Sequence, residues 1–188
     1  MAQQRIHLFK DNKKQGPPHF FYKTESVYSQ FHPCEFQVDD VVYCCAEQYM
    51  MASKSRDFKD EKTLQKIMKE KDPKKIKALG RKVTPFDPTV WNAKAPGHVE
   101  TGNYAKFSQN EHLKKEMLAS GNRLLVEASP KDKIWGIGLS EKQARNTPQD
   151  KWPGKNQLGQ ALMKVRSKLQ TQEKRDEACK EQTEQPED

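Results

Sequence analysis

The chain has 188 residues and a mass of 21.8 kDa, the size of one compact domain. Its composition is 34% hydrophobic and 32% charged, with a mean hydropathy of −1.06. The longest apolar run, residues 41–46, is too short for a transmembrane helix, and residues 1–10 lack the apolar stretch of a signal peptide. Four cysteines are too few for a disulfide scaffold at this size. We therefore expect a reduced intracellular protein, cytoplasmic or nuclear, that does not bind membranes.

The charge is unevenly distributed along the chain. The full sequence carries a net charge of +8, whereas residues 170–188 contain three basic and seven acidic residues. The first 169 residues are therefore strongly basic. A domain of this charge attracts polyanions such as nucleic acids, nucleotides or diphosphates. Lysines that only solvate exposed helix faces would give the same composition, so the charge alone identifies no ligand.

The first half of the chain predicts a lead-in, a few short strands and a helix. Residues 1–19 are polar and predict a flexible lead-in, after which residues 20–22 begin a β-type run. Residues 35–39 alternate apolar and polar side chains, and residues 41–44 follow as the returning strand of a hairpin. Residues 46–55 are rich in helix formers.

Capping residues place most of the remaining elements. Residues 60–71 carry a helical apolar stripe, Asp72-Pro73 begins a helix that ends at Gly80, and Asn110 and Gly121 bound a further helix. The same signals predict a helix over residues 97–108, a short strand over residues 124–128 and a last helix from Asn156. The apolar face of that helix ends at Leu169. We therefore expect residues 170–188 to form an acidic tail that is solvated or disordered.

Helices thus outnumber short strands, without a regular alternation of the two. This pattern predicts an α+β fold: a single, mainly helical domain over residues 20–169 with a small β-sheet. The histidines and cysteines show none of the CxxC, HxH or HExxH spacings of metal sites, and the nucleotide-binding and Gly-x-Ser-x-Gly motifs are absent from the sequence. We expect neither a metal nor a cofactor.

Glu47 and Lys54 are polar residues in an otherwise apolar stretch of the first predicted helix. Their spacing of seven places them on one face of that helix, roughly 10 Å apart. A carboxyl group in apolar surroundings has a raised pKa and can act as a general acid. A lysine there can lose its proton and become an amine nucleophile. An ordinary ion pair on a half-buried helix would have the same spacing, so the pattern leaves both interpretations open.

Two further groups of candidate residues lie in loops. Asp132, Trp135 and Gly136 follow the strand at 124–128 and offer a carboxylate, an indole and close access to the backbone, although a core tryptophan beside a turn would look the same. Lys155 and Asn156 lie where the last helix begins. Free backbone N–H groups at such a helix start suit a phosphate. Capping of the helix by Asn156 is compatible with that role.

Nine short motifs occur in a fixed order along residues 20–169. They are Phe21-Tyr22, Ser29-Gln30-Phe31, Glu47-Gln48-Tyr49 to Lys54, Gly80-Arg81, Trp91, Ala105-Lys106-Phe107, Leu125-Val126-Glu127, Asp132 to Gly136 and Asn156 to Gly159. Together they resemble the NADAR domain family, which includes the YbiA-like proteins. Two positions depart from the family pattern, because Gln30 and Gln48 replace the usual asparagine and histidine. A role for histidine at position 48 is thereby excluded.

The resemblance implies an N-glycosidase that acts on ribosyl compounds. Some members of the family remove ADP-ribose from the amino group of guanine bases in nucleic acid. Relatives with a similar domain cleave the N-glycosidic bond of early intermediates of riboflavin biosynthesis. The expected partners are therefore the ADP-ribose moiety of ADP-ribosylated guanine and DNA or RNA, bound by a monomer. A non-catalytic module that binds ADP-ribose or nucleic acid is a third hypothesis, against which the retained Glu47, Lys54 and Asp132 argue.

The resemblance also implies roles for single residues. Glu47 and Asp132 are expected to act as the acid and as the charge stabiliser or base, by analogy with glycoside hydrolysis. In a second route the ribose ring opens and Lys54 captures the aldehyde carbon as a Schiff base. Trp135 would form a wall for the ribose or base, and Arg81, Lys155 and the Asn156 loop would hold phosphates. The complete set of expected substrate-binding residues is Phe21, Tyr22, Ser29, Arg81, Trp91, Trp135, Gly136, Lys155 and Asn156.

Overall fold

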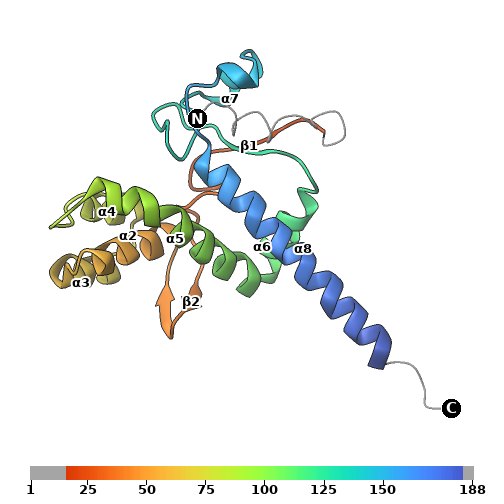
Figure 1. Cartoon of the computed structure of the whole chain (residues 1–188), viewed down its shortest axis with the longest axis horizontal. Coiled ribbons are helices and arrows are strands. Elements are labelled where there is room, and N and C mark those ends of the chain that lie inside the picture. The colour runs from red at the N-terminus through yellow and green to blue at the C-terminus, as the bar shows by residue number, and fades with distance from the viewer. Residues whose placement is uncertain (1–15, 184–188) are drawn as a thin grey trace.

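The structure is a computed structural model that describes residues 16–183. Helices dominate it, as Figure 1 shows. The elements in chain order are β1 (His19–Phe21), β2 (Phe36–Val38), β3 (Val41–Tyr43), α2 (Ala46–Asp57), α3 (Glu61–Lys69), α4 (Pro73–Gly80), α5 (Pro88–Gln109), α6 (Glu111–Ala119), β4 (Leu125–Glu127), α7 (Glu141–Arg145), the 3-10 helix η2 (Gln149–Lys151) and α8 (Gln157–Thr183).

The strands form two separate pairs. β1 runs parallel to β4, with Phe21 opposite Glu127, and β2 pairs with β3 in an antiparallel hairpin. The predicted α+β class, mainly helical with few strands, is confirmed. The strands do not share one sheet, however: the β2–β3 hairpin packs against α5 and is not hydrogen-bonded to β1 or β4, and it projects away from β1 in the view of Figure 1.

Several helices begin at the predicted capping residues. The Asp60 side chain accepts from the N–H of Thr63 at 3.0 Å, and that of Asp72 accepts from the N–H of Lys74 at 2.8 Å. α5 begins nine residues before the predicted position. Asp87 caps it, with Pro88 in the first turn, and Pro96 lies inside it. The predicted start at residue 97 was wrong, because the helix begins at the Asp87-Pro88 cap and continues through Pro96.

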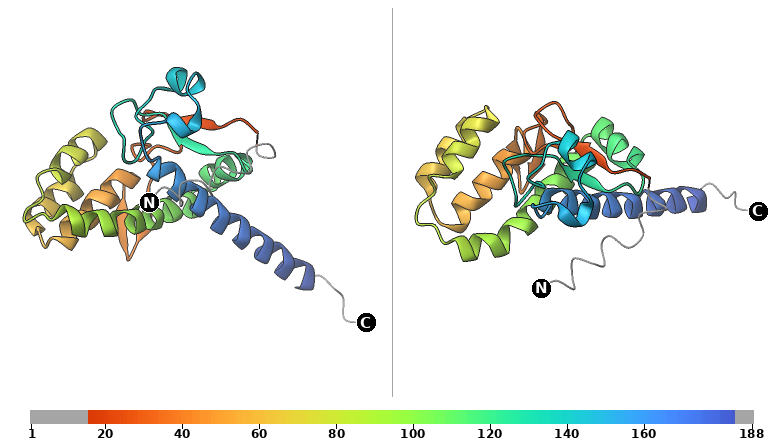
Figure 2. Two further views of the ribbon diagram at one scale, coloured as in Figure 1. Left: turned by 45° about the horizontal axis from the view of Figure 1, so that its top comes forward. Right: turned by 90° about the horizontal axis from the view of Figure 1, so that it is seen from above.

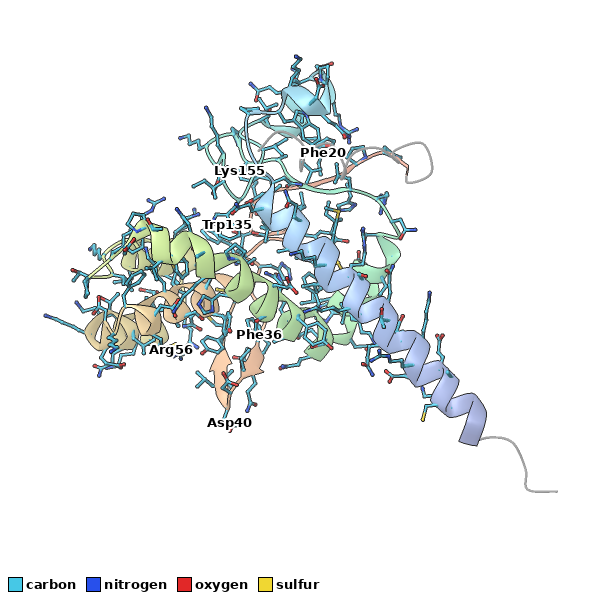
Figure 3. The ribbon with its side chains drawn as sticks, in the orientation of Figure 1. Phe20, Phe36, Asp40, Arg56, Trp135 and Lys155 are labelled. Atoms are coloured by element: carbon cyan, nitrogen blue, oxygen red, sulfur yellow. The ribbon has the colours of Figure 1, made fainter. Side chains whose placement is uncertain are left out.

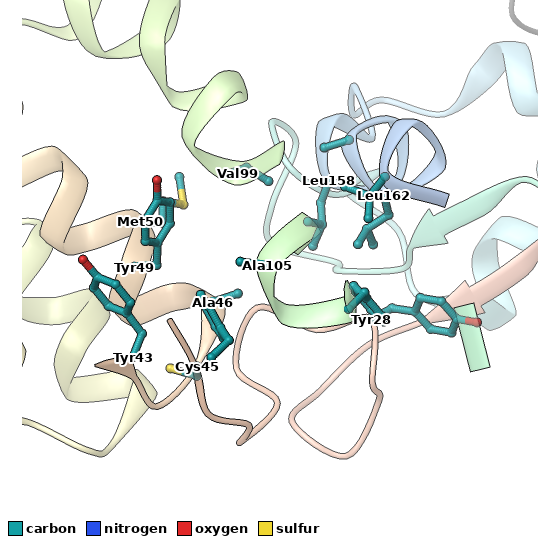
Figure 4. Packing of buried hydrophobic residues seen from close by; sticks show 14 of the residues in the cluster. Tyr28, Tyr43, Cys45, Ala46, Tyr49, Met50, Val99, Ala105, Leu158 and Leu162 are labelled. Carbon is teal, nitrogen blue, oxygen red and sulfur yellow. The ribbon is translucent and has the colours of Figure 1, made fainter. Parts of the chain in front are cut away.

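α2 is the centre of the domain. It packs against α3, α4 and α5, and every residue from Ala46 to Ser55 is buried. A side chain at Gly102 of α5 would place its Cβ only 2.5 Å from the Tyr49 ring, so glycine permits the close approach of the two helices. On its other side α5 packs against α8, where Leu158 and Leu162 extend the same core (Figure 4).

The predicted disordered tail is wrong for residues 170–183, which continue α8 as helix. Leu169 is the last buried apolar residue of α8, and beyond it the helix projects away from the domain (Figures 1 and 2). These residues include many good helix formers, and Glu173 pairs with Lys114 at 3.3 Å. Residues 1–15 of the predicted lead-in and residues 184–188 of the tail lie outside the described part. No helix within residues 16–183 is long and apolar enough to cross a membrane.

Candidate active site

Glu47 lies in the first turn of α2, with its side chain 3% exposed. Its backbone N–H donates to the carbonyl of Gln30 at 2.9 Å, which ties the start of the helix to the loop before β2. Burial raises the pKa of its carboxyl group to about 7, a rise that Lys77 opposes and Asp132 supports. Near neutral pH this group can therefore both give and take a proton.

Glu127, at the end of β4, is half-buried and carries a second carboxyl group of the site, one oxygen of which lies inside the protein. Its Oε2 is inaccessible to solvent and has no hydrogen-bond partner within residues 16–183. Burial raises its pKa to about 7, and the charges of Asp132 and Glu47 add to the rise. Glu127 belongs to the family motif Leu125-Val126-Glu127, but no role was predicted for it. The signal it missed was a carboxylate inside an apolar strand.

Asp132 is the third carboxyl group of this cluster. Its Oδ1 accepts from the backbone N–H groups of Ile134 at 2.9 Å and Trp135 at 2.8 Å, which fixes the carboxyl group in the turn after β4. Its charge raises the pKa of both Glu47 and Glu127. The three carboxyl groups, from α2, β4 and a loop, are thus close enough to influence one another.

Two cations flank the carboxyl cluster, Lys77 on α4 and Arg81 just after it. Lys77 lowers the pKa of both glutamates, and Arg81 lowers that of Glu47. The Lys77 Nζ also lies 5.5 Å from the centre of the Phe31 ring, which places it over the loop that holds Glu47. Arg81 was expected at the site, whereas Lys77 was not singled out because it looked like any other lysine of a charged helix.

Lys54 lies two helical turns from Glu47, beside aromatic rings. Its Nζ donates to the carbonyl of Gly80 at 2.9 Å, and it lies 4.0 Å from the centre of the Phe86 ring and 5.6 Å from that of Trp91. Burial lowers its pKa. Gly80 is bonded to Arg81, so the Lys54 end and the carboxyl cluster meet at the C-terminus of α4.

Trp91 forms the wall of the Lys54 end. It is 9% exposed and stacks on His98, with the ring centres 5.9 Å apart. Asp57 holds His98 at 2.8 Å and Lys94 at 2.9 Å, so an ion-paired group joins α2 to α5 behind the tryptophan. Trp91 and Lys54, both expected at the site, thus lie side by side, and the binding of substrate by Trp91 stays a prediction.

The backbone N–H groups of residues 154–158 at the start of α8 already have partners within the protein, which corrects the expected phosphate loop. The N–H groups of residues 154–158 all donate to carbonyls of residues 133–137, at 2.8 to 3.2 Å. Asn156 is buried, and its side chain bonds to β4, with Nδ2 donating to Leu125 and Oδ1 accepting from Glu127. The side chain of Lys155 stays exposed near the start of α8, close to the loop of Trp135 (Figure 3).

Other expected contact residues have structural partners. A Cβ on Gly136 would lie 2.9 Å from the carbonyl oxygen of Glu127, so this glycine lets the loop pack on β4 rather than on a ligand. Phe21 is 4% exposed and packs on Tyr28 in the core. The Ser29 Oγ accepts from the N–H of Phe31 at 3.1 Å. Tyr22, in contrast, is 46% exposed.

A buried polar network supports the loop that holds Glu47. Lys106 of α5 is fully buried and donates to the carbonyl of Ser29 at 2.9 Å, and Asn103 donates to the Gln30 side chain at 2.7 Å. Burial lowers the pKa of Lys106 to about 8. This support was not predicted from the sequence. Polar side chains on the inner face of the helix were the signal that could have indicated it.

The carboxyl cluster does not have the arrangement of a metal site, since no group of three or more His, Cys, Asp or Glu side chains within residues 16–183 converges closely enough. A surface cavity of about 280 Å³ lies elsewhere, between α5 and α8. It is lined by Tyr104, Ser167, Lys168, Thr171, Gln172 and Arg175. Because none of these is a carboxyl group or an expected site residue, the cavity is separate from the candidate active site.

Comparisons with known proteins show the family of this chain. The model of the NADAR domain matches residues 20–170. The chain is 47% identical to the N-glycosidase R617 of Acanthamoeba polyphaga mimivirus, over 85% of this chain and 92% of that protein. It is 29% identical to the riboflavin biosynthesis protein VVA0006 of Vibrio vulnificus, over 81% of this chain and 39% of that protein. The solved structure of Escherichia coli YbiA matches with a TM-score of 0.70 at 26% identity, over 85% of this chain and 88% of YbiA. The chain therefore belongs to the NADAR domain family.

Proposed function

We propose that this chain is an N-glycosidase that releases ADP-ribose from the amino group of guanine bases in DNA or RNA. The observation that carries the proposal is the cluster of Glu47, Glu127 and Asp132, in which two carboxyl groups have pKa values of about 7. The names of relatives that are N-glycosidases support the reaction class. The guanine-linked substrate extends beyond those names and comes from the family resemblance.

The reaction needs a proton donor and a group that stabilises positive charge. The C1′–N bond breaks as the guanine amine takes a proton, and water then adds to C1′ and loses a proton to a carboxylate. Glu47 and Glu127 can transfer protons near pH 7 because each exchanges its proton in that range. Asp132 supplies negative charge beside the developing oxocarbenium ion.

Lys54 offers a second route for the same reaction. In that route the ribose ring opens, the Lys54 amine replaces the guanine amine at C1′ as a Schiff base, and water hydrolyses the adduct. The lowered pKa of Lys54 favours the neutral amine that this step requires. Nζ would first have to leave the carbonyl of Gly80. In either route we assign the proton transfers to Glu47 and Glu127.

The remaining groups suit the rest of an ADP-ribose molecule. Arg81 and Lys77 are cations beside the cluster and match the charge of a diphosphate. The half-buried Trp135 provides an indole next to Asp132, where it can form a wall for the ribose or base. Lys155 adds an exposed cation near the same loop.

A second candidate substrate is a phosphoribosylamino-pyrimidine, because the matched Vibrio vulnificus relative is named a riboflavin biosynthesis protein. Both substrates join a phosphorylated ribose to an amine on a pyrimidine-type ring. The test incubates the protein with a guanine-ADP-ribosylated oligonucleotide and with the riboflavin intermediate, and measures free ADP-ribose and ribose phosphate. We expect release of ADP-ribose, lost in Glu47→Gln. Turnover of the pyrimidine alone would select the second candidate, and tight binding without turnover of either would indicate a binding module.

A further inference from the structure

We propose that six cations around the carboxyl cluster form a docking surface for the sugar–phosphate backbone of a single nucleic-acid strand. This cationic rim comprises Lys77, Arg81, Lys82, Lys131, Lys133 and Lys155. The inference rests on the proposed function, which needs a base from a strand to reach Glu47 and Glu127.

One side of the cationic rim lies at the C-terminal end of α4. The Lys77 Nζ lies 5.5 Å from the centre of the Phe31 ring, in the loop whose Gln30 carbonyl accepts from the N–H of Glu47 at 2.9 Å, and Arg81 follows the last residue of the same helix. Lys82 follows Arg81 and is exposed. These three charges therefore border the carboxyl cluster on the α4 side.

The other side of the cationic rim lies on the loop after β4. Lys131 and Lys133 are exposed residues on either side of Asp132. The backbone N–H of Lys155 donates to the carbonyl of Lys133 at 2.9 Å, which brings a third cation to this loop. Ile137 of the same loop donates its N–H to the carbonyl of Glu127 at 3.0 Å, and Asn156, next to Lys155, accepts from the N–H of Glu127 at 3.0 Å, so this side of the rim lies beside the carboxyl cluster.

The cations of the rim, all exposed except the half-buried Lys77, make no close ion pair in the described part of the chain. Within residues 16–183, none of the six forms an ion pair with a carboxylate. Cations at other places do form such pairs: Lys168 pairs with Glu100 at 2.6 Å and Lys94 with Asp57 at 2.9 Å. Exposed, unpaired cations release counterions when phosphates bind, so they can contribute directly to affinity.

Exposed apolar side chains accompany both sides of the rim. Phe86 is 45% exposed and lies 4.0 Å from the Lys54 Nζ, near Gly80 and Arg81. Ile134 is 51% exposed and lies between Lys133 and Trp135. A phosphate-binding surface with exposed aromatic side chains is typical of proteins that hold a single strand, because unpaired bases stack on aromatic rings; Phe86 is the side chain of this kind beside the rim.

A duplex would not deliver its guanine amino group to buried carboxyl groups. Enzymes that act on a base take it out of the stack or use an already single strand. Glu47 is 3% exposed, so the base must leave the stack to reach it. The rim would then hold the phosphates on either side of the displaced nucleotide.

The test measures binding of a fluorescent, unmodified single-stranded 12-mer by anisotropy over a series of salt concentrations. The variant Lys82→Glu/Lys133→Glu changes one residue on each side of the rim, and neither residue has an assigned role in the reaction. The charge-matched control is Lys174→Glu/Arg175→Glu, at the exposed far end of α8 (Figure 1). For a single strand, the logarithm of the binding constant falls by about 0.7 per phosphate contact for each tenfold rise in salt concentration. The loss of two contacts should therefore weaken binding by the rim variant about 25-fold at 0.1 M salt, relative to a 1 M reference.

The control variant should bind the strand much more tightly than the rim variant does. Equal binding by wild type and the rim variant, or an equal loss in both variants, would overturn the proposal. Hydrolysis of an ADP-ribosylated guanosine nucleoside should be the same in wild type and the rim variant. If no variant hydrolyses that nucleoside while the rim variant alone loses the strand, the proposed function fails and the docking surface stands.

Discussion

The Asn156 side chain accepts a hydrogen bond from the backbone N–H of Glu127 at 3.0 Å and donates one to the carbonyl of Leu125 at 2.8 Å. The side chain therefore makes the same pair of backbone hydrogen bonds to β4, one accepted and one donated, that a neighbouring β-strand would make. Asn156 has a φ of 52°, a left-handed conformation that asparagine tolerates better than most residues. The start of α8 is in this way linked to the end of β4 where Glu127 lies.

We expect Asn156→Ala to destabilise the protein and to misplace Glu127. The change leaves a buried N–H and a buried carbonyl of β4 without partners, each of which costs about 1–3 kcal/mol. Urea unfolding should show the loss, and kcat should fall more than KM rises. Asn146→Ala is the control, because Asn146 bonds only to an exposed helix carbonyl. An Asn156→Ala variant as stable and active as wild type would contradict the role of this asparagine.

Glu127→Gln should fold normally and lose about 10²–10⁴ of the rate of hydrolysis, the usual contribution of a general acid or base. Glutamine has nearly the same shape but cannot exchange a proton in this range. Single-turnover rates measured with equal amounts of folded protein give the comparison. Glu111→Gln, at an exposed position on α6, should keep wild-type activity. Rapid turnover in Glu127→Gln would leave Glu47 as the only assigned proton donor.

The pH dependence of the reaction should depend on Asp132. With pKa values of about 7 for both Glu47 and Glu127, the protonated acid is lost as the pH rises through 7, and kcat/KM should fall there. Asp132→Asn keeps an oxygen for the two turn N–H groups but removes the negative charge that raises both pKa values. The descending limb of its remaining activity should move to lower pH. An unmoved limb would place the titrating group elsewhere.

The buried carboxyl of Glu47 should also reduce stability at high pH. Its pKa is raised from 4.5 to about 7, so the folded state binds more protons between these values, and the stability contributed by the neutral group is lost as the pH rises through this range. Glu47→Gln avoids the loss, which is about 3 kcal/mol at most. The Tm of Glu47→Gln minus the Tm of wild type should therefore increase by several degrees between pH 4.5 and pH 8. Glu111→Gln should show no such increase.

Local signals in the sequence predicted much of the fold. The Asp60 and Asp72 caps and the β2–β3 hairpin depend on neighbouring residues, so their patterns were visible. The parallel pairing of β1 with β4 joins residues about a hundred positions apart, for which the chain has no local signal. The helical tail was not predicted because the apolar face ends at Leu169, whereas the helix continues through good helix formers to Thr183.

The same distinction applies to the candidate site. Glu47 and Lys54 share one helix, and their spacing was visible in the sequence. The cluster of Glu47 with Glu127 is a tertiary contact across eighty residues, and only burial in the folded protein gives both groups their pKa. The prediction of a phosphate-binding loop at the start of α8 was wrong for a similar reason, because the N–H groups of residues 154–158 donate to carbonyls of residues 133–137, which are distant in the sequence.

Lys54 decides between the two chemical routes. If the ribose ring opens on the enzyme, the Lys54 amine must bond to C1′, and cyanoborohydride added during turnover should reduce the Schiff base and fix ADP-ribose on this residue. Peptide mass spectrometry would locate the adduct.

Lys54→Arg keeps the charge beside Phe86 but cannot form the adduct, so in this route it should be inactive while it still binds ADP-ribose. If Lys54 instead only holds the Gly80 carbonyl and the aromatic wall, the arginine variant should retain much of the activity and no adduct should form. Lys94→Arg is the control, because the Lys94 side chain is half exposed. Lys106→Arg would be a poor control, because Lys106 is fully buried. An active Lys54→Arg variant without any trapped species would leave the carboxyl groups to perform the reaction alone.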